Sequence, residues 1–119
     1  MIIYQRPKQT VKYGNVKTVE DGIKFDSKHE SLRYIELKYL ERIGQIRGLQ
    51  LQVPFELIPA QKDENGKVVE RAVKYIADFV YFDADGNLVV EDAKGMKTDA
   101  YKLKKKMMRF FKGIEIKEV

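Results

Sequence analysis

The chain has 119 residues, of which 44% are hydrophobic and 34% are charged, a composition typical of one globular domain with a charged surface. It contains no cysteine and one histidine, which excludes disulfides, zinc–cysteine sites, HNH-type nuclease centres and multi-histidine metal sites. The 23 basic residues exceed the 18 acidic ones by five, and this surplus favours a polyanionic partner.

No hydrophobic run approaches the roughly 20 residues of a membrane span, and the first residues lack the apolar core of a signal peptide. We therefore expect a cytoplasmic protein with neither a membrane partner nor an organic cofactor. Without a repeat or a linker, residues 1–119 predict a single domain. A Ser-His-Asp hydrolase would have to use His29, and no Gly-x-Ser-x-Gly motif is present to supply its nucleophile.

The first 26 residues are polar and rich in turn signals. Asp21-Gly22 predicts a small hairpin between residues 17–20 and 23–25. The first dozen residues are either a basic arm on nucleic acid or a frayed terminus, and the sequence leaves both open. Residues 1–26 are therefore assigned to an N-terminal arm and hairpin, and residues 27–119 to the core of the domain.

A first helix is predicted over residues 27–45, where apolar side chains recur at the helical period. Ser27 is its expected N-cap, and Gly44 marks its exit. The apolar stripe that carries this prediction comprises Leu32, Ile35, Tyr39, Ile43 and Ile46. Glu30, three residues after Ser27, either closes a capping box or points over the sheet toward acids on the strands.

Alternating residues predict a strand over 49–59, and Pro54 places it at an edge or a bulge. Its two expected faces are Leu51, Val53, Phe55 and Leu57 on one side, and Gln50, Gln52, Pro54 and Glu56 on the other. Gln52 lies either on a solvated polar face or within reach of a substrate phosphate or a metal-bound water. Two further strands are predicted over 68–82 and 87–94, with an Asp-Gly turn between them.

Acidic residues occupy strand positions where packing would favour valine or isoleucine, with Asp78 in one predicted strand and Asp92 in the next. Side chains alternate along a strand, so Asp92 and Lys94 project to the same side. If Asp78 pairs near Asp92, two carboxylates and an ammonium meet on one face, and the carboxylates repel unless a cation lies between them. Oxygen ligands without thiolates suit Mg²⁺ or Mn²⁺. The alternative is a surface salt bridge on a half-exposed hairpin.

A second helix is predicted over residues 98–112, capped by Thr98 or Asp99. Its apolar stripe, which we expect in the core, comprises Leu103, Met107, Phe110 and Phe111. Residues 113–118 alternate again and predict a short final strand. A right-handed crossover through the helix makes that strand parallel to the third one.

Basic residues dominate the segment from Lys94 to Lys112, where eight lysines and arginines oppose a single acid, Asp99. Such a run is either a solvated helix face or a surface for the phosphate backbone of nucleic acid, which would make binding strongly salt-dependent. The candidate nucleic-acid contacts are Gln52, Lys97, Tyr101, Lys102, Lys104, Lys105 and Arg109.

The predicted order is helix, three strands, helix and strand, which describes an α/β (α+β) fold with an αβββαβ core and a mixed sheet flanked by two helices. This order, together with Asp78 and the segment Asp92-Ala93-Lys94, resembles the PD-(D/E)XK nuclease superfamily, with Ala77 in place of the usual proline. Four stretches are similar to a small phage and prophage family of this restriction-endonuclease-like class, which is related to Holliday-junction resolvases. They are residues 13–15, 21–30, 75–79 and 91–95.

The resemblance implies a catalytic and metal-binding site made of Glu30, Asp78, Asp92, the carbonyl group of Ala93, and Lys94. Lys94 would orient the attacking water, and the other four would hold the metal ion. Glu36 lies on the same predicted helix as Glu30 and competes for its role. Glu91 points to the opposite face from Asp92, and we reject it as the motif acid.

The implied activity is that of a Mg²⁺- or Mn²⁺-dependent endonuclease that hydrolyses DNA phosphodiester bonds, acting on branched or recombination intermediates in a bacterial host cell. DNA is the expected partner, and a homodimer would let so small a domain make paired cuts. Two alternatives stay open. One is a non-catalytic nucleic-acid-binding module, and the other is an accessory subunit of a phage replication or packaging complex.

Overall fold

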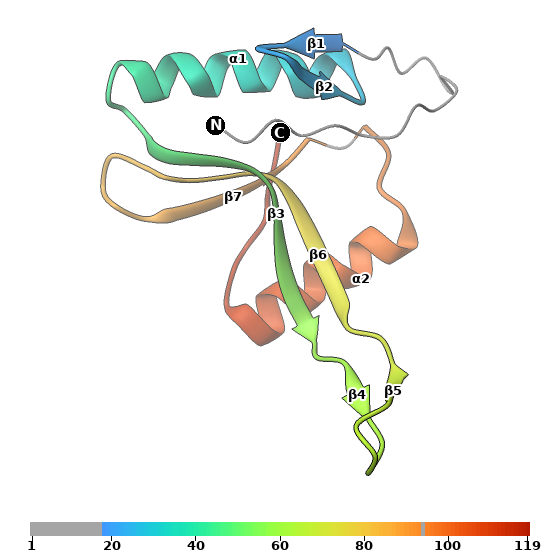
Figure 1. Cartoon of the computed structure of the whole chain (residues 1–119). Helices are drawn as coiled ribbons and strands as arrows, with labels where there is room; N and C mark the ends of the chain where they lie inside the picture. Colours follow the sequence, from blue (N-terminus) through green and yellow to red (C-terminus); the bar gives the residue numbers. More distant parts are fainter. Residues whose placement is uncertain (1–17, 94) are drawn as a thin grey trace.

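A four-stranded sheet separates two helices in the computed structural model, which describes residues 18–93 and 95–119 (Figure 1). The helices are α1 (Lys28–Arg42) and α2 (Asp99–Met107), and α2 continues as a π-helical turn over Met108–Lys112. The strands are β1 (Thr18–Glu20), β2 (Ile23–Phe25), β3 (Arg47–Ile58), β4 (Gln61–Lys62), β5 (Val68–Glu70), β6 (Val73–Phe82), β7 (Leu88–Asp92) and β8 (Lys117–Glu118). The predicted N-terminal arm and Lys94 lie outside the described residues.

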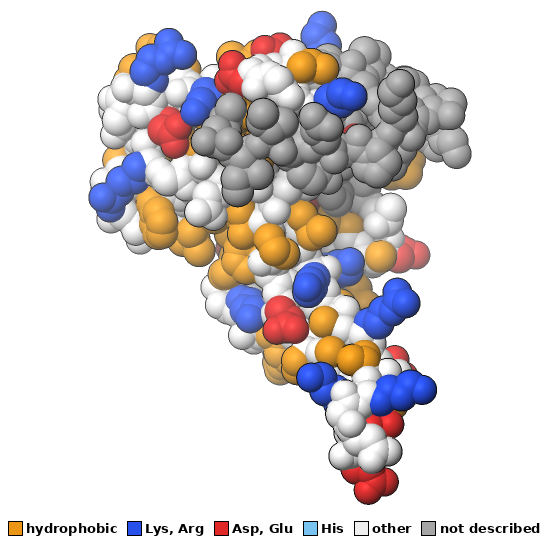
Figure 2. Space-filling view, viewed as in Figure 1, with side chains coloured by type: hydrophobic (Ala, Val, Ile, Leu, Met, Phe, Trp, Pro, Cys, Tyr) orange, Lys and Arg blue, Asp and Glu red, His pale blue; other side chains and the backbone are white. Residues whose placement is uncertain are grey.

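The sheet has the strand order β3-β6-β7-β8. β3, β6 and β7 are antiparallel neighbours, and β8 runs parallel to β7. The αβββαβ order, the mixed sheet and the β1–β2 hairpin are therefore as predicted. β4 and β5 form a small ladder that extends the β3–β6 pair away from the sheet, and acidic and basic side chains lie close together along this projection (Figure 2). Among the described residues, no helix has the length and apolar character that crossing a membrane demands.

Side-chain hydrogen bonds fix where the elements begin and turn. The hydroxyl oxygen of Ser27 accepts the backbone N–H of Glu30 at 3.1 Å, and that of Thr98 accepts the N–H of Tyr101 at 3.1 Å. Both residues are N-caps. The predicted cap Ser27 is therefore confirmed, and of the two predicted candidates for the second helix, Thr98 and not Asp99 is the cap. Asp83 closes the turn between β6 and β7 by accepting two backbone N–H groups, so the predicted hairpin that carries the acidic residues is confirmed.

The face of α1 that packs on the sheet is not the apolar stripe that predicted the helix. Tyr34 and Leu37 are buried, whereas the stripe residues within the helix and at its end, Leu32, Ile35, Tyr39 and Ile43, are 44–56% exposed. The ring of Tyr34 packs on that of Phe25 with centroids 5.1 Å apart, and its hydroxyl donates to Asp21 at 2.8 Å. The β1–β2 hairpin therefore sets the rotation of α1, and of the predicted stripe only Ile46 is buried.

β3 changes faces at Gln52, whose backbone is in the left-handed region with a φ of 53°. Leu49 and Leu51 pack on the α1 side of the sheet, whereas Val53 and Phe55 pack on the α2 side. The predicted regular alternation from residue 50 to residue 57 is therefore wrong, because one residue with positive φ turns the rest of the strand over.

β6 changes faces opposite the same point. Ala77 packs on the α2 side and Phe79 on the α1 side, although regular alternation would put both on one face. Leu51 pairs with Phe79 and Val53 with Ala77, so Gln52 and Asp78 face each other across the two strands. Asp78 thus lies where both strands switch, and β6 is buried continuously around it.

Most of the apolar stripe predicted on the second helix lies outside the core, and of its members only Met107 packs against it, partly buried. Tyr101 and Met108 are buried, whereas Leu103, Phe110 and Phe111 are exposed. Leu103 and Phe110 are two turns apart and lie on the face turned away from Tyr101 and Met108. The π turn that begins at Met108 contains more residues per turn than an α-helix, so Phe111 does not return to the buried face.

Candidate metal centre and active site

Asp78 lies within β6 and is only 5% exposed. Its Oδ2 accepts the backbone N–H of Ala93 at 2.8 Å, and its Oδ1 accepts a hydrogen bond from Nε2 of Gln52 at 3.1 Å. The carboxylate is therefore held between β3 and the end of β7. The left-handed backbone of Gln52 places its amide on this candidate metal ligand, and a contact of Gln52 with a phosphate or a metal-bound water stays a prediction.

Asp92 ends β7 and is 1% exposed. Its Oδ2 accepts the hydroxyl of Tyr75 at 2.6 Å. Burial first, and then this hydrogen bond and the charge of Asp92, raise the pKa of Tyr75, so the hydroxyl remains protonated and donates. Nothing in the sequence indicated the contact between Tyr75 and Asp92, because that contact depends on the face switch in β6.

The charges of both aspartates affect tyrosines on the α2 side of the sheet. Besides burial and hydrogen bonding, the charges of Asp78 and Asp92 both raise the pKa of Tyr75 in β6 and that of Tyr101 in α2. The two tyrosine rings lie 6.3 Å apart between centroids. Two carboxylates on adjacent strands, both near these tyrosines, are the basis of the predicted metal site, and the binding of an ion there stays a prediction.

The other predicted members of the site do not complete a ligand set around these aspartates. Glu30 is buried in the first turn of α1, but within residues 18–93 and 95–119 no three acidic or histidine side chains are placed to hold one ion. Glu36 is exposed and pairs with Arg33 at 3.1 Å. Lys94 lies outside the described residues, and the roles of Glu30 and of the Ala93 carbonyl stay predictions.

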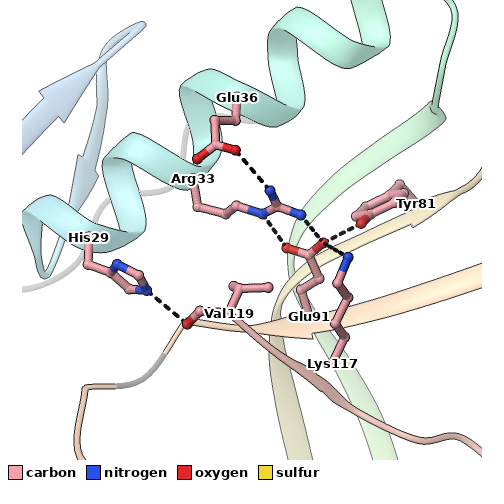
Figure 3. Close-up of polar contacts among 7 residues, drawn as sticks. All are labelled: His29, Arg33, Glu36, Tyr81, Glu91, Lys117 and Val119. Atoms are coloured by element: carbon pink, nitrogen blue, oxygen red, sulfur yellow. Dashed lines mark hydrogen bonds and ion pairs between the residues drawn. The ribbon is translucent and has the colours of Figure 1, made fainter.

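Glu91, the neighbour of Asp92, points to the α1 side and is fully buried. Arg33 of α1 binds both of its oxygens, from Nε at 2.8 Å and from Nη2 at 2.6 Å (Figure 3). The hydroxyl of Tyr81 donates to the same carboxylate, and Nζ of Lys117 lies 3.9 Å from it. These four residues form what we call the Glu91 cluster. The predicted orientation of Glu91, opposite to that of Asp92, is confirmed, but its three partners were not predicted.

A second contact fixes the start of α1. Nε2 of His29 lies 2.8 Å from the Val119 oxygen (Figure 3). The N–H of Val119 donates to the carbonyl of Asp92 at 3.1 Å. The first turn of α1 is therefore tied to the end of β7 through the last residue of the chain. Together with the Glu91 cluster, this contact holds the turn that carries Glu30 against the strand that carries Asp92.

Three of the predicted nucleic-acid contacts converge on Glu118. Its carboxylate accepts Nζ of Lys105 at 3.1 Å and the hydroxyl of Tyr101 at 2.9 Å, and Nζ of Lys97 lies 3.2 Å away. These hydrogen bonds, that from Lys105 foremost, lower the pKa of Glu118 to about 2. The remaining candidates on this helix, Lys102, Lys104 and Arg109, make no ion pair within the described part of the chain.

A family model described as "Protein of unknown function (DUF1064)" matches residues 10–117. The chain belongs to this family. The description of DUF1064 names neither an activity nor a substrate, so the resemblance to PD-(D/E)XK nucleases stays a prediction. No curated protein and no solved structure gives a significant match to this DUF1064 chain. The chemistry of Asp78 and Asp92 therefore decides which function we propose.

Proposed function

We propose that this DUF1064 chain is a metal-dependent DNA endonuclease of the PD-(D/E)XK class. The observation that supports this most directly is the pair of buried carboxylates, Asp78 and Asp92, on adjacent strands, whose charges both raise the pKa of Tyr75 and of Tyr101. Burying two carboxylates costs stability unless charge or hydrogen bonds compensate. Positions where a sequence departs in this way from what packing favours are characteristic of functional sites.

The donors around the two carboxylates fit a metal site. They include an amide, a backbone N–H and a hydroxyl, which orient the oxygens without supplying positive charge. Carboxylate oxygens are the ligands that Mg²⁺ and Mn²⁺ prefer. We therefore assign a divalent cation to Asp78 and Asp92, with Glu30 and the carbonyl of Ala93 as further proposed ligands.

A divalent cation at this position would lower the pKa of the attacking water and stabilise the charge that develops on the phosphate. The chain positions the reactants. Asp78 and Asp92 would hold the cation at the sheet, and Tyr75 keeps Asp92 oriented. Lys94 would hold the attacking water in line with the phosphorus. Such a hydrolysis needs no covalent intermediate.

The basic helix supports DNA as the substrate. Lys102, Lys104 and Arg109 carry positive charge that no acid neutralises within the described residues. Tyr101 of the same helix lies close enough to the two aspartates for their charges to raise its pKa. A phosphate backbone that reaches the aspartates would therefore meet these cations, and binding should weaken steeply with salt.

An exposed apolar stripe favours a second candidate function. Leu32, Ile35, Tyr39 and Ile43 lie along one face of α1 and are about half exposed. Contiguous apolar surface of this kind is typical of protein–protein contacts. It would suit a homodimer of the nuclease, or an accessory subunit recruited to a phage replication or packaging complex.

The test is cleavage of labelled four-way junction, flap, duplex and single-stranded DNA with Mg²⁺, Mn²⁺ or EDTA. We expect cleavage to require the metal ion and to fall by at least about 100-fold in Asp78→Asn, Asp92→Asn and Lys94→Ala. Asp85→Asn, the same chemical change at the exposed β6–β7 turn, is the matched control and should cut normally. Cleavage that survives EDTA or any of the three changes at the site would contradict the proposal. Salt-dependent binding without cleavage would favour the non-catalytic module.

A further inference from the structure

Two adjacent phenylalanines are exposed at the end of the basic helix. Phe110 is 82% exposed and Phe111 is 53% exposed. Their rings meet edge to face, with centroids 5.1 Å apart and planes at 83°. Large aromatic side chains are normally buried, so a pair this exposed indicates a surface that binds another molecule.

The backbone holds this pair in place. The π turn that carries it begins at Met108, which is fully buried, and ends at Gly113, whose φ is 66°. The N–H of Gly113 donates to the carbonyl of Arg109 at 3.1 Å, and the N–H of Ile114 donates to that of Met108 at 3.3 Å. The two rings therefore stand on a turn that is anchored on both sides, and little order has to be gained when they bind.

Three cations lie close to the pair in the sequence. Lys106 lies one helical turn before Phe110, and Arg109 and Lys112 directly precede and follow the two phenylalanines. None of the three makes an ion pair in the part of the chain that the structure describes, whereas Lys97 and Lys105 both pair with Glu118. The surface therefore combines aromatic faces with free positive charge.

This combination identifies the occupant. Phenylalanine and arginine are also common in protein–protein interfaces, but lysine, which supplies two of the three cations here, is depleted at their centres, and this argues against an apolar protein partner. Stacking of bases on aromatic rings, with phosphates on nearby cations, is how proteins bind single-stranded nucleic acid. A duplex hides its base faces, so only unpaired nucleotides can stack. We infer that Phe110 and Phe111 stack the unpaired bases of a flap or branch point while Arg109 and Lys112 neutralise its phosphates.

This inference deepens the proposed function, since it names the kind of DNA that the nuclease would select. It can be tested without cleavage, by fluorescence anisotropy in EDTA with a labelled single strand, a flap and a blunt duplex. Phe110→Ala should weaken binding of the single strand and the flap by about 5- to 150-fold, and binding of the duplex by less than about twofold. Phe82→Ala, the same chemical change at an exposed phenylalanine at the end of β6, is the control and should change neither.

A second variant reports stacking directly. The chain has no tryptophan, so Phe110→Trp introduces a single one, and its fluorescence should be quenched by the single strand but not by the duplex. Equal losses on all three DNAs, no loss in Phe110→Ala, or no quenching would overturn the inference. So would a dimer in sedimentation that Phe110→Ala dissolves. If the Phe110→Trp chain cleaves DNA with Mg²⁺ but shows no stacking, this inference alone is refuted. If it stacks a single strand but cleaves no DNA, only the proposed nuclease is refuted.

Discussion

The Glu91 cluster should contribute a large share of the stability with which α1 is attached to the sheet. Arg33→Met keeps most of the side-chain length and removes the guanidinium that binds both oxygens of Glu91. Glu91 is fully buried. Removing one partner of a buried ion pair typically lowers the free energy of unfolding by about 3–5 kcal/mol, because the remaining charge is buried without a partner. Lys117 is a weak substitute, since its Nζ is 3.9 Å away and the residue is exposed.

We therefore expect Arg33→Met to lower the free energy of unfolding by about 3 kcal/mol, measured by urea denaturation. For a domain of this size, that loss corresponds to a fall in Tm of about 10 °C. Glu36→Gln is the matched control, because Glu36 also binds Arg33 but is exposed, and it should change stability by less than about 0.5 kcal/mol.

A double-mutant cycle isolates the contact itself. In Arg33→Met/Glu91→Gln the buried charge is gone, and the amide oxygen that replaces the carboxylate can still accept the Tyr81 hydroxyl. The double variant should therefore lose less stability than the two single variants added together, with a coupling energy of about 1–3 kcal/mol. If Arg33→Met costs no more than Glu36→Gln, or if the two changes simply add, the Glu91 cluster does not hold α1 as described.

Two other predictions concern the backbone of β3 and the charge on β8. Gln52→Asn and Gln52→Val should both lose the hydrogen bond to Asp78, and the valine variant should be less stable than the asparagine variant by about 1–2 kcal/mol, because asparagine tolerates positive φ; both are measured by urea denaturation. The pKa of Glu118 is lowered to about 2 by Lys105, Tyr101 and Lys97, so its contribution to stability is complete above its ordinary pKa near 4.5 and is lost as the pH falls toward 2. Glu118→Gln should flatten the pH dependence of Tm over that interval.

The sequence predicted the order and pairing of the elements because those depend on local signals. Asp21-Gly22 and the turn closed by Asp83 lie between runs of strand formers, and Ser27 and Thr98 are good helix caps. These signals act within a few residues of the chain, so they do not depend on the tertiary packing. The αβββαβ order and the parallel β8 followed from them and from the handedness of the crossover.

The rotation of each helix and the face of each strand residue were not predictable in the same way. α1 carries apolar residues on two faces, and a contact between Tyr34 and the β1–β2 hairpin decides which one packs. Glutamine is not a residue that signals positive φ, so nothing in the sequence marked the face switch at Gln52. The hydrogen bonds from Gln52 and Tyr75 to the aspartates depend on that switch, and for this reason they were missed.

Adjacent acids in β7 should have separable roles, and this gives the sharpest test of the site. Glu91 faces α1 and is neutralised by Arg33, whereas Asp92 faces α2 and accepts a hydroxyl. Glu91→Gln should therefore lower the Tm in the absence of metal but leave intact the rise in Tm that Mg²⁺ produces. Asp92→Asn keeps an oxygen for Tyr75 and should abolish that rise, because a ligand charge is lost. The reverse pattern would mean that the metal, if it binds, lies on the α1 side of the sheet, and the proposed centre would be wrong.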